Sequence, residues 1–240
     1  MVNILISGYY GFDNIGDESI LRTLVSSLRE HIPDCSLTVL SHNPASTREK
    51  YGVEAVDRMS PMAILRAVKK CDMLISGGGS LLQDVTSSKS LHYYLSIIRC
   101  AEFFHKKVFI YSQGIGPIDR PGNRRAAAAA LKRADGIVVR DERSAALLEE
   151  IGIARDKVVI TADPVIRMKK PDGDVGAEIL RKAGVSLDGR LTVGWAIRER
   201  DTDSHFVKEL LRSIQMMKDK YNAQSVLIPF HYEEDGEVCR

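Results

Sequence analysis

Short apolar runs alternate with stretches of helical periodicity over the first two thirds of the chain. The runs are nearly continuous in apolar residues, which is typical of strands buried on both faces. They predict strands at 3–7, 36–40, 72–76, 108–113, 137–140 and 158–161. Between them, the spacing of apolar residues predicts helices at 19–31, 61–70, 91–105, 124–133 and 143–151. We therefore expect an α/β fold with a parallel sheet, forming a Rossmann-like domain over residues 1–167.

A change in composition follows at residues 168–176. This segment, MKKPDGDVG, combines charge with a proline and two glycines and is typical of a linker. A second α/β pattern then begins, with helices predicted at 175–183 and 204–220 and strands at 191–196 and 225–229. Two strands do not make a self-sufficient sheet layer. We expect residues 177–240 to form the incomplete, truncated start of a second Rossmann-like domain, unless an unusual small domain docks on the first.

The composition of the chain excludes several classes of protein. The chain has 240 residues, of which 44% are hydrophobic and 28% charged, and a net charge of +2. These values exclude a disordered chain and bulk nucleic-acid binding. The four cysteines show no CxxC spacing, so we expect no zinc site and four reduced, mostly buried thiols. No apolar run is long enough to cross a bilayer and the N-terminus reads as a strand, so we expect a cytoplasmic protein.

Ligands of a doubly wound sheet bind beyond the carboxyl ends of its strands, so the loops there carry the candidate chemistry. The first such loop, GYYGFDNIGDE at 8–18, is neither a dinucleotide fingerprint nor a Walker loop. Asp17 could grip a ligand, cap the following helix, or do both. Of Tyr9 and Tyr10, we expect one to pack into the sheet and the other to stack on a sugar ring. The candidate ligand-binding residues of this loop are Gly8, Tyr10, Asn14, Asp17 and Glu18.

Two more glycine-bearing loops are expected at the same edge of the sheet. Three consecutive glycines follow the strand at 72–76 and predict either an anion-binding nest or a steric turn. The segment YSQGIGP follows the next strand. Three such loops together predict the floor of a crevice. The candidate ligand-binding residues of these two loops are Gly77, Gly78, Gly79, Ser80, Gln83, Asp84, Gln113 and Gly114.

Charged residues complete the candidate site. Arg140 ends a strand, where its guanidinium would bind a carboxylate or phosphate, or else pair with Asp141 or a glutamate. Asp163 is interpreted as a cap or turn former. Arg198 and His231 follow the two strands of the second pattern and are further ligand candidates. The other histidines lack metal-ligand spacing, so no metal site is predicted.

Five motifs in order, GYYGFDNIGDE, SGGGSLLQD, YSQGIGP, VVRDERS and TADPV, resemble the polysaccharide pyruvyl transferase family, most closely its CsaB-type, S-layer-anchoring members. The resemblance implies a GT-B-like arrangement, in which an acceptor-side and a donor-side Rossmann-like domain face a cleft. It also implies transfer of a pyruvyl group from phosphoenolpyruvate to a sugar of a cell-envelope polysaccharide. In CsaB-type members the implied acceptor is a lipid-linked glycan that contains N-acetylmannosamine, and no further cofactor is implied.

The resemblance assigns roles to several candidates. Arg140 matches the family's donor-clamping arginine, while Asn14, Asp17 and the 77–79 loop would line the acceptor groove. Asp17 or Glu18 could assist deprotonation of the sugar hydroxyl. The family's catalytic histidine, in an RLH-type motif of the second domain, has no counterpart up to residue 240, so we expect this chain to be inactive alone. Membrane contact is expected only through the acceptor lipid, and a homo-oligomer remains open.

Two other interpretations remain open. A GT-B glycosyltransferase with a nucleotide-sugar donor would share the fold and the glycine loops. Binding of a nucleoside diphosphate, without binding of phosphoenolpyruvate, would favour it. A non-catalytic glycan-binding module would instead bind a glycan without turnover.

Overall fold

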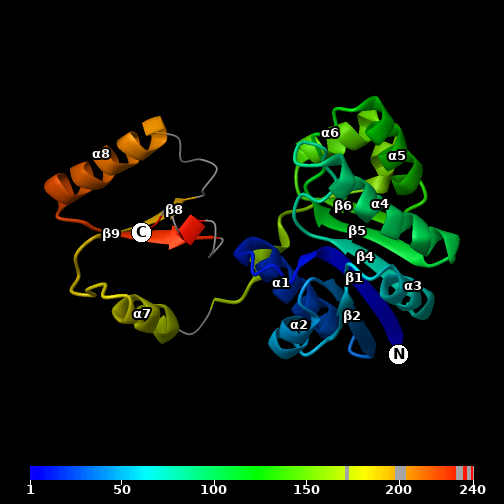
Figure 1. The fold of residues 1–240 in the computed structure, drawn as a ribbon, viewed down its shortest axis with the longest axis horizontal. Coiled ribbons are helices and arrows are strands. Elements are labelled where there is room, and N and C mark those ends of the chain that lie inside the picture. The colour runs from blue at the N-terminus through cyan, green and yellow to red at the C-terminus, as the bar shows by residue number, and fades with distance from the viewer. Residues whose placement is uncertain (171–172, 198–203, 231–234, 237–238, 240) are drawn as a thin grey trace. The chain divides into compact units, whose positions relative to one another are not determined.

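The computed structural model describes residues 1–170, 173–197, 204–230, 235–236 and 239 (Figure 1). The chain divides into two compact units. The first comprises Met1–Phe12 and Gly16–Met168, and the second comprises Asp13–Ile15 and Lys169–Arg240. Each unit has its own sheet.

The first unit is built on a seven-stranded sheet with strand order β3-β2-β1-β4-β5-β6-β7. All six neighbouring strand pairs are parallel, which confirms the predicted α/β class and parallel sheet. The strands are β1 (Val2–Tyr10), β2 (Cys35–Ser41), β3 (Glu54–Asp57), β4 (Met73–Gly77), β5 (Lys107–Gln113), β6 (Gly136–Val139) and β7 (Val158–Ile160).

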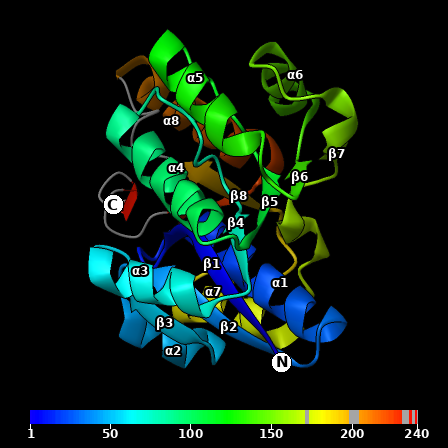
Figure 2. The ribbon, with the colours of Figure 1, turned by 90° about the vertical axis from the view of Figure 1, so that its right-hand side faces the viewer.

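Helices cover both faces of this sheet. They are α1 (Ile15–His31), α2 (Pro44–Tyr51), α3 (Pro61–Lys70), α4 (Ser88–Phe103), α5 (Pro121–Leu131) and α6 (Glu142–Glu150), with the 3₁₀ turns η1 (Arg155–Lys157) and η2 (Pro164–Arg167). Alternate residues of β1 point to opposite faces. Ile4 joins a core with Leu21 of α1, whereas Leu5 joins a larger core with Leu91 of α4. Figure 2 shows α3, α4 and α5 side by side across that second face.

The order of the strands places the candidate loops together. From β1 the chain builds outward through β2 and β3, then crosses back to β4 and builds outward through β5, β6 and β7. β1 and β4 are therefore neighbours at a topological switch point, where open α/β sheets form their ligand crevice. The loop after β1 and the glycine triplet after β4 both leave the sheet at this point.

The sequence analysis missed α2 and β3. The helix α2 has no apolar stripe, and local signals form it instead. Asn43 accepts a hydrogen bond from the Ser46 N–H at 3.2 Å, Pro44 occupies the first turn, and Gly52 ends the helix in a left-handed conformation. The strand β3 has only four residues, two of them acidic. Such a strand becomes visible only through its pairing with β2.

The second unit contains a two-stranded parallel sheet, β8 (Thr192–Ile197) paired with β9 (Gln224–Pro229). Its helices are α7 (Gly173–Lys182) and α8 (Ser204–Tyr221). The predicted elements are thus all present. Residues 173–176, which the sequence assigned to a linker, are helical, and Asp174 in the first turn of α7 favours that start through the helix dipole.

The cysteines differ from expectation. All four are free, but only Cys71 is buried, and Cys35, Cys100 and Cys239 are half-buried. Burial raises the pKa of the Cys71 thiol to about 11. Within the described ranges, no helix is both long and apolar enough to pass through a bilayer.

Candidate active site

The loops after β4 and β5 are tied into one surface at the carboxyl edge of the sheet. The Gly114 N–H donates to the Gly79 carbonyl at 2.9 Å, and the Gly116 N–H donates to the Leu82 carbonyl at 2.8 Å. Leu82 and Ile115 also form a parallel bridge. Because backbone groups of the two loops bond one another, the loops form a continuous and fixed floor.

The glycine triplet brings this floor against α1. Gly78 and Gly79 adopt left-handed conformations, with φ of +72° and +67°. A Cβ on Gly78 would lie 2.1 Å from the Ile20 side chain, and one on Gly79 would lie 2.8 Å from Asp17 Oδ1. The Gly78 N–H is already used, donating to the Tyr111 carbonyl at 3.1 Å. The triplet therefore acts as a steric turn that places the Asp17 carboxylate beside Gly79.

Arg140, the residue after β6, reaches back over the same floor. Its Nη1 donates to Asp163 Oδ2 at 2.9 Å, and its Nη2 donates to Ser80 Oγ at 3.0 Å. The guanidinium lies over Gly114, where a Cβ would stand 2.9 Å from Nε and Nη2. The Arg140 side chain is 30% exposed. It is therefore oriented by its neighbours while remaining open to a ligand.

Arg140 forms the ion pair with Asp141 that the sequence allowed, and a closer one with Asp163. Asp141 Oδ2 lies 3.8 Å from Arg140 Nε, while the other Asp141 oxygen caps α6 by accepting the Ser144 N–H at 2.8 Å. Burial alone would raise the pKa of Asp141, but the Ser144 hydrogen bonds and the Arg140 charge hold it below its usual value. Asp163 caps η2 through the Val165 N–H, which confirms the predicted cap, and its second oxygen holds Arg140.

A cavity of about 530 Å³ opens beside Arg140. Arg124 and Arg143 contribute two more guanidinium groups to its wall. Arg124 pairs with Glu150 at 3.3 Å. Within the described part of the chain, Arg143 makes no ion pair. Arginines outnumber carboxylates in this wall, so the cavity favours an anionic group.

Asp17 and Glu18 differ in their surroundings. Both lie in the first turn of α1, which begins at Ile15, so Asp17 is not the residue that caps the helix. Carboxylates in a first turn are stabilised by the helix dipole. Glu18 accepts the Gly11 N–H at 2.8 Å and a short hydrogen bond from the Tyr51 hydroxyl. Glu18 therefore ties the loop after β1 to α2, and this leaves Asp17 as the carboxylate beside the glycine floor.

The two tyrosines of the first loop take opposite positions. Tyr10 is 1% exposed, and its hydroxyl donates to the Gly77 carbonyl at 2.7 Å. Burial, and then the negative charge of Asp17, raise the pKa of Tyr10 well above its ordinary value. Tyr10 is thus enclosed by the fold, and its contact with a ligand stays a prediction. Tyr9 is 37% exposed and stacks on Phe12, so the expectation that one tyrosine packs into the sheet is confirmed.

Asp84 is predicted from the sequence as a ligand contact, and in the structure it is hydrogen-bonded within the fold. It is 7% exposed and accepts the backbone N–H groups of Asp119 and Arg120 at 2.9 and 3.1 Å. The Asn123 side-chain amide donates to it at 2.7 Å. Burial acts to raise the pKa of Asp84, but these hydrogen bonds outweigh it and hold the pKa below its usual value. Asp84 thus anchors the start of α5.

Both predicted glutamines are also engaged by the fold. Gln113 is fully buried and donates to the Ser76 hydroxyl at 2.8 Å, so its side chain lies inside the sheet. A register shift between β5 and β6 at Ile110 and Gln113 accompanies this inward position. Gln83 is half-buried and bonds both the hydroxyl and the N–H of Thr86, which shapes the turn before α4.

The remaining predicted residues are placed as follows. Gly8 is buried at the end of β1, and its carbonyl accepts a hydrogen bond from Arg58 at 3.0 Å. Asn14 is half-buried and immediately precedes α1. Ser80 is exposed. Arg198 and His231 lie outside the described residues.

Sequence reasoning missed Arg58. This residue directly follows β3, as Arg140 follows β6, and it is only 7% exposed. Its signal was the position of an arginine after a strand. That signal could not be used because β3 itself was not predicted.

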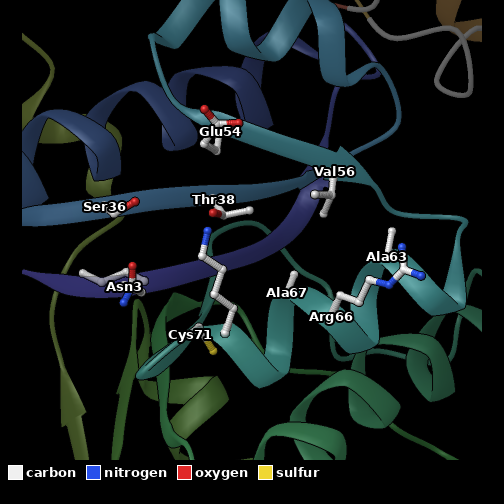
Figure 3. A pocket seen from close by; sticks show the side chains of 11 residues that line it. Asn3, Ser36, Thr38, Glu54, Val56, Ala63, Arg66, Ala67 and Cys71 are labelled. Atoms are coloured by element: carbon white, nitrogen blue, oxygen red, sulfur yellow. The ribbon is translucent and has the colours of Figure 1, made fainter.

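A second cavity, of about 380 Å³, lies at the opposite, amino edge of the sheet (Figure 3). It is bounded by Asn3 and Ser36 near the starts of their strands and by Arg66 and Cys71 at α3. None of the sequence motifs reaches this cavity. Among the described residues, no group of three or more His, Cys, Asp or Glu side chains is arranged to hold a metal ion.

Comparison with known proteins relates the chain to one family. Residues 14–240 match the family model described as polysaccharide pyruvyl transferase. The chain is also similar to the amylovoran biosynthesis protein AmsJ of Erwinia amylovora, with 24% identity over 82% of this chain and 57% of that protein. The chain therefore spans little more than half the length of this curated relative.

Solved structures share the fold. The structure of Anabaena Alr3699/HepE in complex with UDP-glucose matches with a TM-score of 0.62 at 12% identity, over 99% of this chain and 64% of that one. The UDP-GlcNAc 2-epimerase of Methanocaldococcus jannaschii matches with a TM-score of 0.61 at 13% identity, over 98% of this chain and 68% of that one. These likenesses confirm the GT-B-like fold predicted from the sequence.

Proposed function

The chain belongs to the polysaccharide pyruvyl transferase family, and on that basis we propose that the whole protein transfers a pyruvyl group from phosphoenolpyruvate to a sugar of a cell-envelope polysaccharide precursor. The observation that carries this proposal is the open guanidinium of Arg140 beside an arginine-lined cavity. Phosphoenolpyruvate bears a carboxylate and a phosphate, and planar guanidinium groups bind both in bidentate fashion.

The reaction makes two carbon–oxygen bonds and breaks one. Protonation of the methylene carbon of phosphoenolpyruvate makes the neighbouring carbon electrophilic, and a sugar hydroxyl attacks it. The bond to phosphate then breaks, and a second hydroxyl of the same sugar closes the cyclic ketal. One proton has entered the new methyl group, both hydroxyl protons have left, and inorganic phosphate is released.

In this proposal the described residues position the substrates and stabilise charge during these reaction steps. Arg140 binds the anionic donor, with Asp163 and Ser80 fixing its orientation. Arg143 supplies a second positive charge in the same cavity. Asp17, beside the glycine floor, accepts a proton from the attacking hydroxyl. Tyr9, which is 37% exposed, contacts a sugar of the acceptor. A lipid-linked acceptor would bring the protein to the inner face of the plasma membrane.

Calorimetric titration tests the donor. Phosphoenolpyruvate is titrated into the protein and into its Arg140→Gln variant, with UDP and UDP-glucose as competing candidates. Binding of phosphoenolpyruvate that is weakened at least about tenfold by the substitution supports the proposal. Binding of UDP without binding of phosphoenolpyruvate would instead indicate a nucleotide-sugar enzyme. Mass spectrometry of an N-acetylmannosamine-containing oligosaccharide incubated with both substrates tests the transfer.

A further inference from the structure

Arg58 is a buried cation. It follows β3 and is 7% exposed, and no carboxylate pairs with it in the described ranges. Its Nε is buried without a hydrogen-bond partner. Burying a charge without an opposite charge is costly, and an apolar side chain of similar length would avoid the cost. The presence of arginine at position 58 therefore indicates a function that needs a guanidinium group.

The contacts of Arg58 join α4 to the segment Gly8–Phe12, which comprises the end of β1 and the start of the loop that follows it. Its Nη1 donates to the Gly8 carbonyl at 3.0 Å, and its Nη2 donates to the Tyr94 hydroxyl at 3.2 Å. The guanidinium carbon lies over four aromatic rings, at 4.7 Å from the centroid of Tyr93, 5.1 Å from that of Phe12, and 5.5 and 5.8 Å from those of Tyr94 and Tyr9. Cation–π attraction of this kind is stronger when the cation is desolvated, as here.

Tyr9 and Phe12 of this segment form an aromatic stack with His42, the residue that follows β2. The Tyr9 and Phe12 rings are parallel with centroids 4.0 Å apart, and the His42 ring lies parallel to Phe12 at 4.4 Å. Tyr9 is 37% exposed and His42 is exposed, so the stack has open surface. Arg58 contacts the stack both at two of its rings and at the backbone that leads into it.

The stack lies close to the candidate active site. Tyr10, which directly follows Tyr9 in β1, donates its hydroxyl to the carbonyl of Gly77, the first glycine of the triplet, at 2.7 Å. Asp17 in turn lies against Gly79. A ligand on the glycine floor would therefore reach the aromatic stack on the β3 side and Arg140 on the β6 side.

We propose that Arg58 is a positioning residue for the sugar acceptor, holding the Gly8–Phe12 loop so that the Tyr9–Phe12–His42 stack forms one wall of the acceptor subsite. This inference rests on the proposed function. It requires that loss of Arg58 weakens binding of the acceptor and leaves binding of the donor, at Arg140, unchanged. If Arg58 served only the stability of the fold, its loss would weaken the binding of both substrates together or of neither.

The test uses Arg58→Met, which keeps the length of the side chain, and Arg58→Lys, which keeps the cation and one donor. Initial rates give KM for phosphoenolpyruvate and for an N-acetylmannosamine-containing oligosaccharide, alongside kcat and thermal unfolding. We expect Arg58→Met to raise the acceptor KM about tenfold with the donor KM unchanged, and Arg58→Lys to recover part of the loss. Arg66→Met, on α3 at the amino edge, is the matched control and should change neither constant.

The result that overturns the inference is an acceptor KM unchanged in Arg58→Met, or equal rises for donor and acceptor. Should Arg58→Met fail to fold, Arg58→Lys and Phe12→Leu must still show the acceptor-selective rise. If the unaltered protein neither binds phosphoenolpyruvate nor transfers a pyruvyl group, the proposed function itself fails. If the unaltered protein is active and the acceptor KM is unchanged in these variants, only the role of Arg58 is overturned.

Discussion

The guanidinium of Arg140 is held by the Asp163 carboxylate at 2.9 Å, across the ends of the neighbouring strands β6 and β7. The pair fixes a cation over Gly114 without burying it. A partly exposed ion pair contributes about 1 kcal/mol or less to stability. The value of the pair is therefore the orientation of a positive charge toward the cavity beside it.

This relationship separates binding from stability. Arg140→Lys keeps the charge but loses the planar fork, so we expect donor affinity to fall about tenfold or more while the free energy of unfolding changes by about 1 kcal/mol or less. Calorimetry with phosphoenolpyruvate and urea denaturation measure the two quantities. Arg125→Lys, on the exposed part of α5, is the control. Equal donor affinity in Arg140→Lys and the unaltered protein would contradict this role.

Gly79→Ala should damage both the fold and the site. At φ +67°, an alanine is strained, and its Cβ would meet Asp17 Oδ1 at 2.8 Å. We expect a loss of about 1–3 kcal/mol of unfolding free energy, together with a lower kcat because Asp17 is displaced. Gly122→Ala in α5 is the control, since a Cβ there meets nothing within 4 Å. It should be neutral or stabilise by up to about 1 kcal/mol. Unchanged stability and rate in Gly79→Ala would refute the close approach of α1.

Asp84→Asn should reveal a pH-dependent anchor. The pKa of Asp84 is lowered in the folded state, so its stabilising contribution is complete above the unfolded pKa of about 4 and is lost as the pH falls through the folded value. We expect the substitution to cost about 1–3 kcal/mol at pH 7, because a buried acceptor of three N–H groups is replaced. The cost should shrink below pH 4.

Denaturant unfolding between pH 3 and pH 7 measures this dependence. Asp119→Asn is the matched control, because Asp119 is exposed and its backbone N–H, not its side chain, makes the contact. A cost for Asp84→Asn that stays constant over this pH range would show that the carboxylate charge is not what anchors α5.

Cys71 should be the least reactive thiol of the folded protein. Its side chain is buried and its pKa is about 11, whereas Cys35 and Cys239 are half-buried. Alkylation requires the thiolate and access to it. We expect iodoacetamide at pH 8 to label Cys71 at least about tenfold more slowly than Cys35, with the difference lost in guanidinium chloride. Mass spectrometry of peptides reads the rates, and equal labelling in the folded state would contradict the burial of Cys71.

Strong periodicity made most of the fold readable. Apolar runs such as the one in β4 and the one-sided pattern of α1 require burial, so they specify the element wherever it packs. The exceptions, α2 and β3, owe their structure to caps and to pairing. Boundaries differ for the same reason. Pro121, for example, begins α5 three residues before the apolar pattern does.

The candidate site, like the fold, could be predicted only in part from the sequence. The amino-acid pattern is enough to place the glycine loops, Arg140 and Asp17 at one edge of a parallel sheet, because strand order and connection rules bring carboxyl ends together. Which polar groups face inward depends on the packing of the folded chain. This packing buries Tyr10, Asp84 and Gln113, pairs Arg140 with Asp163, and encloses Arg58 among aromatic rings. These outcomes depend on contacts between residues distant in the chain, and local spacing carries no record of them.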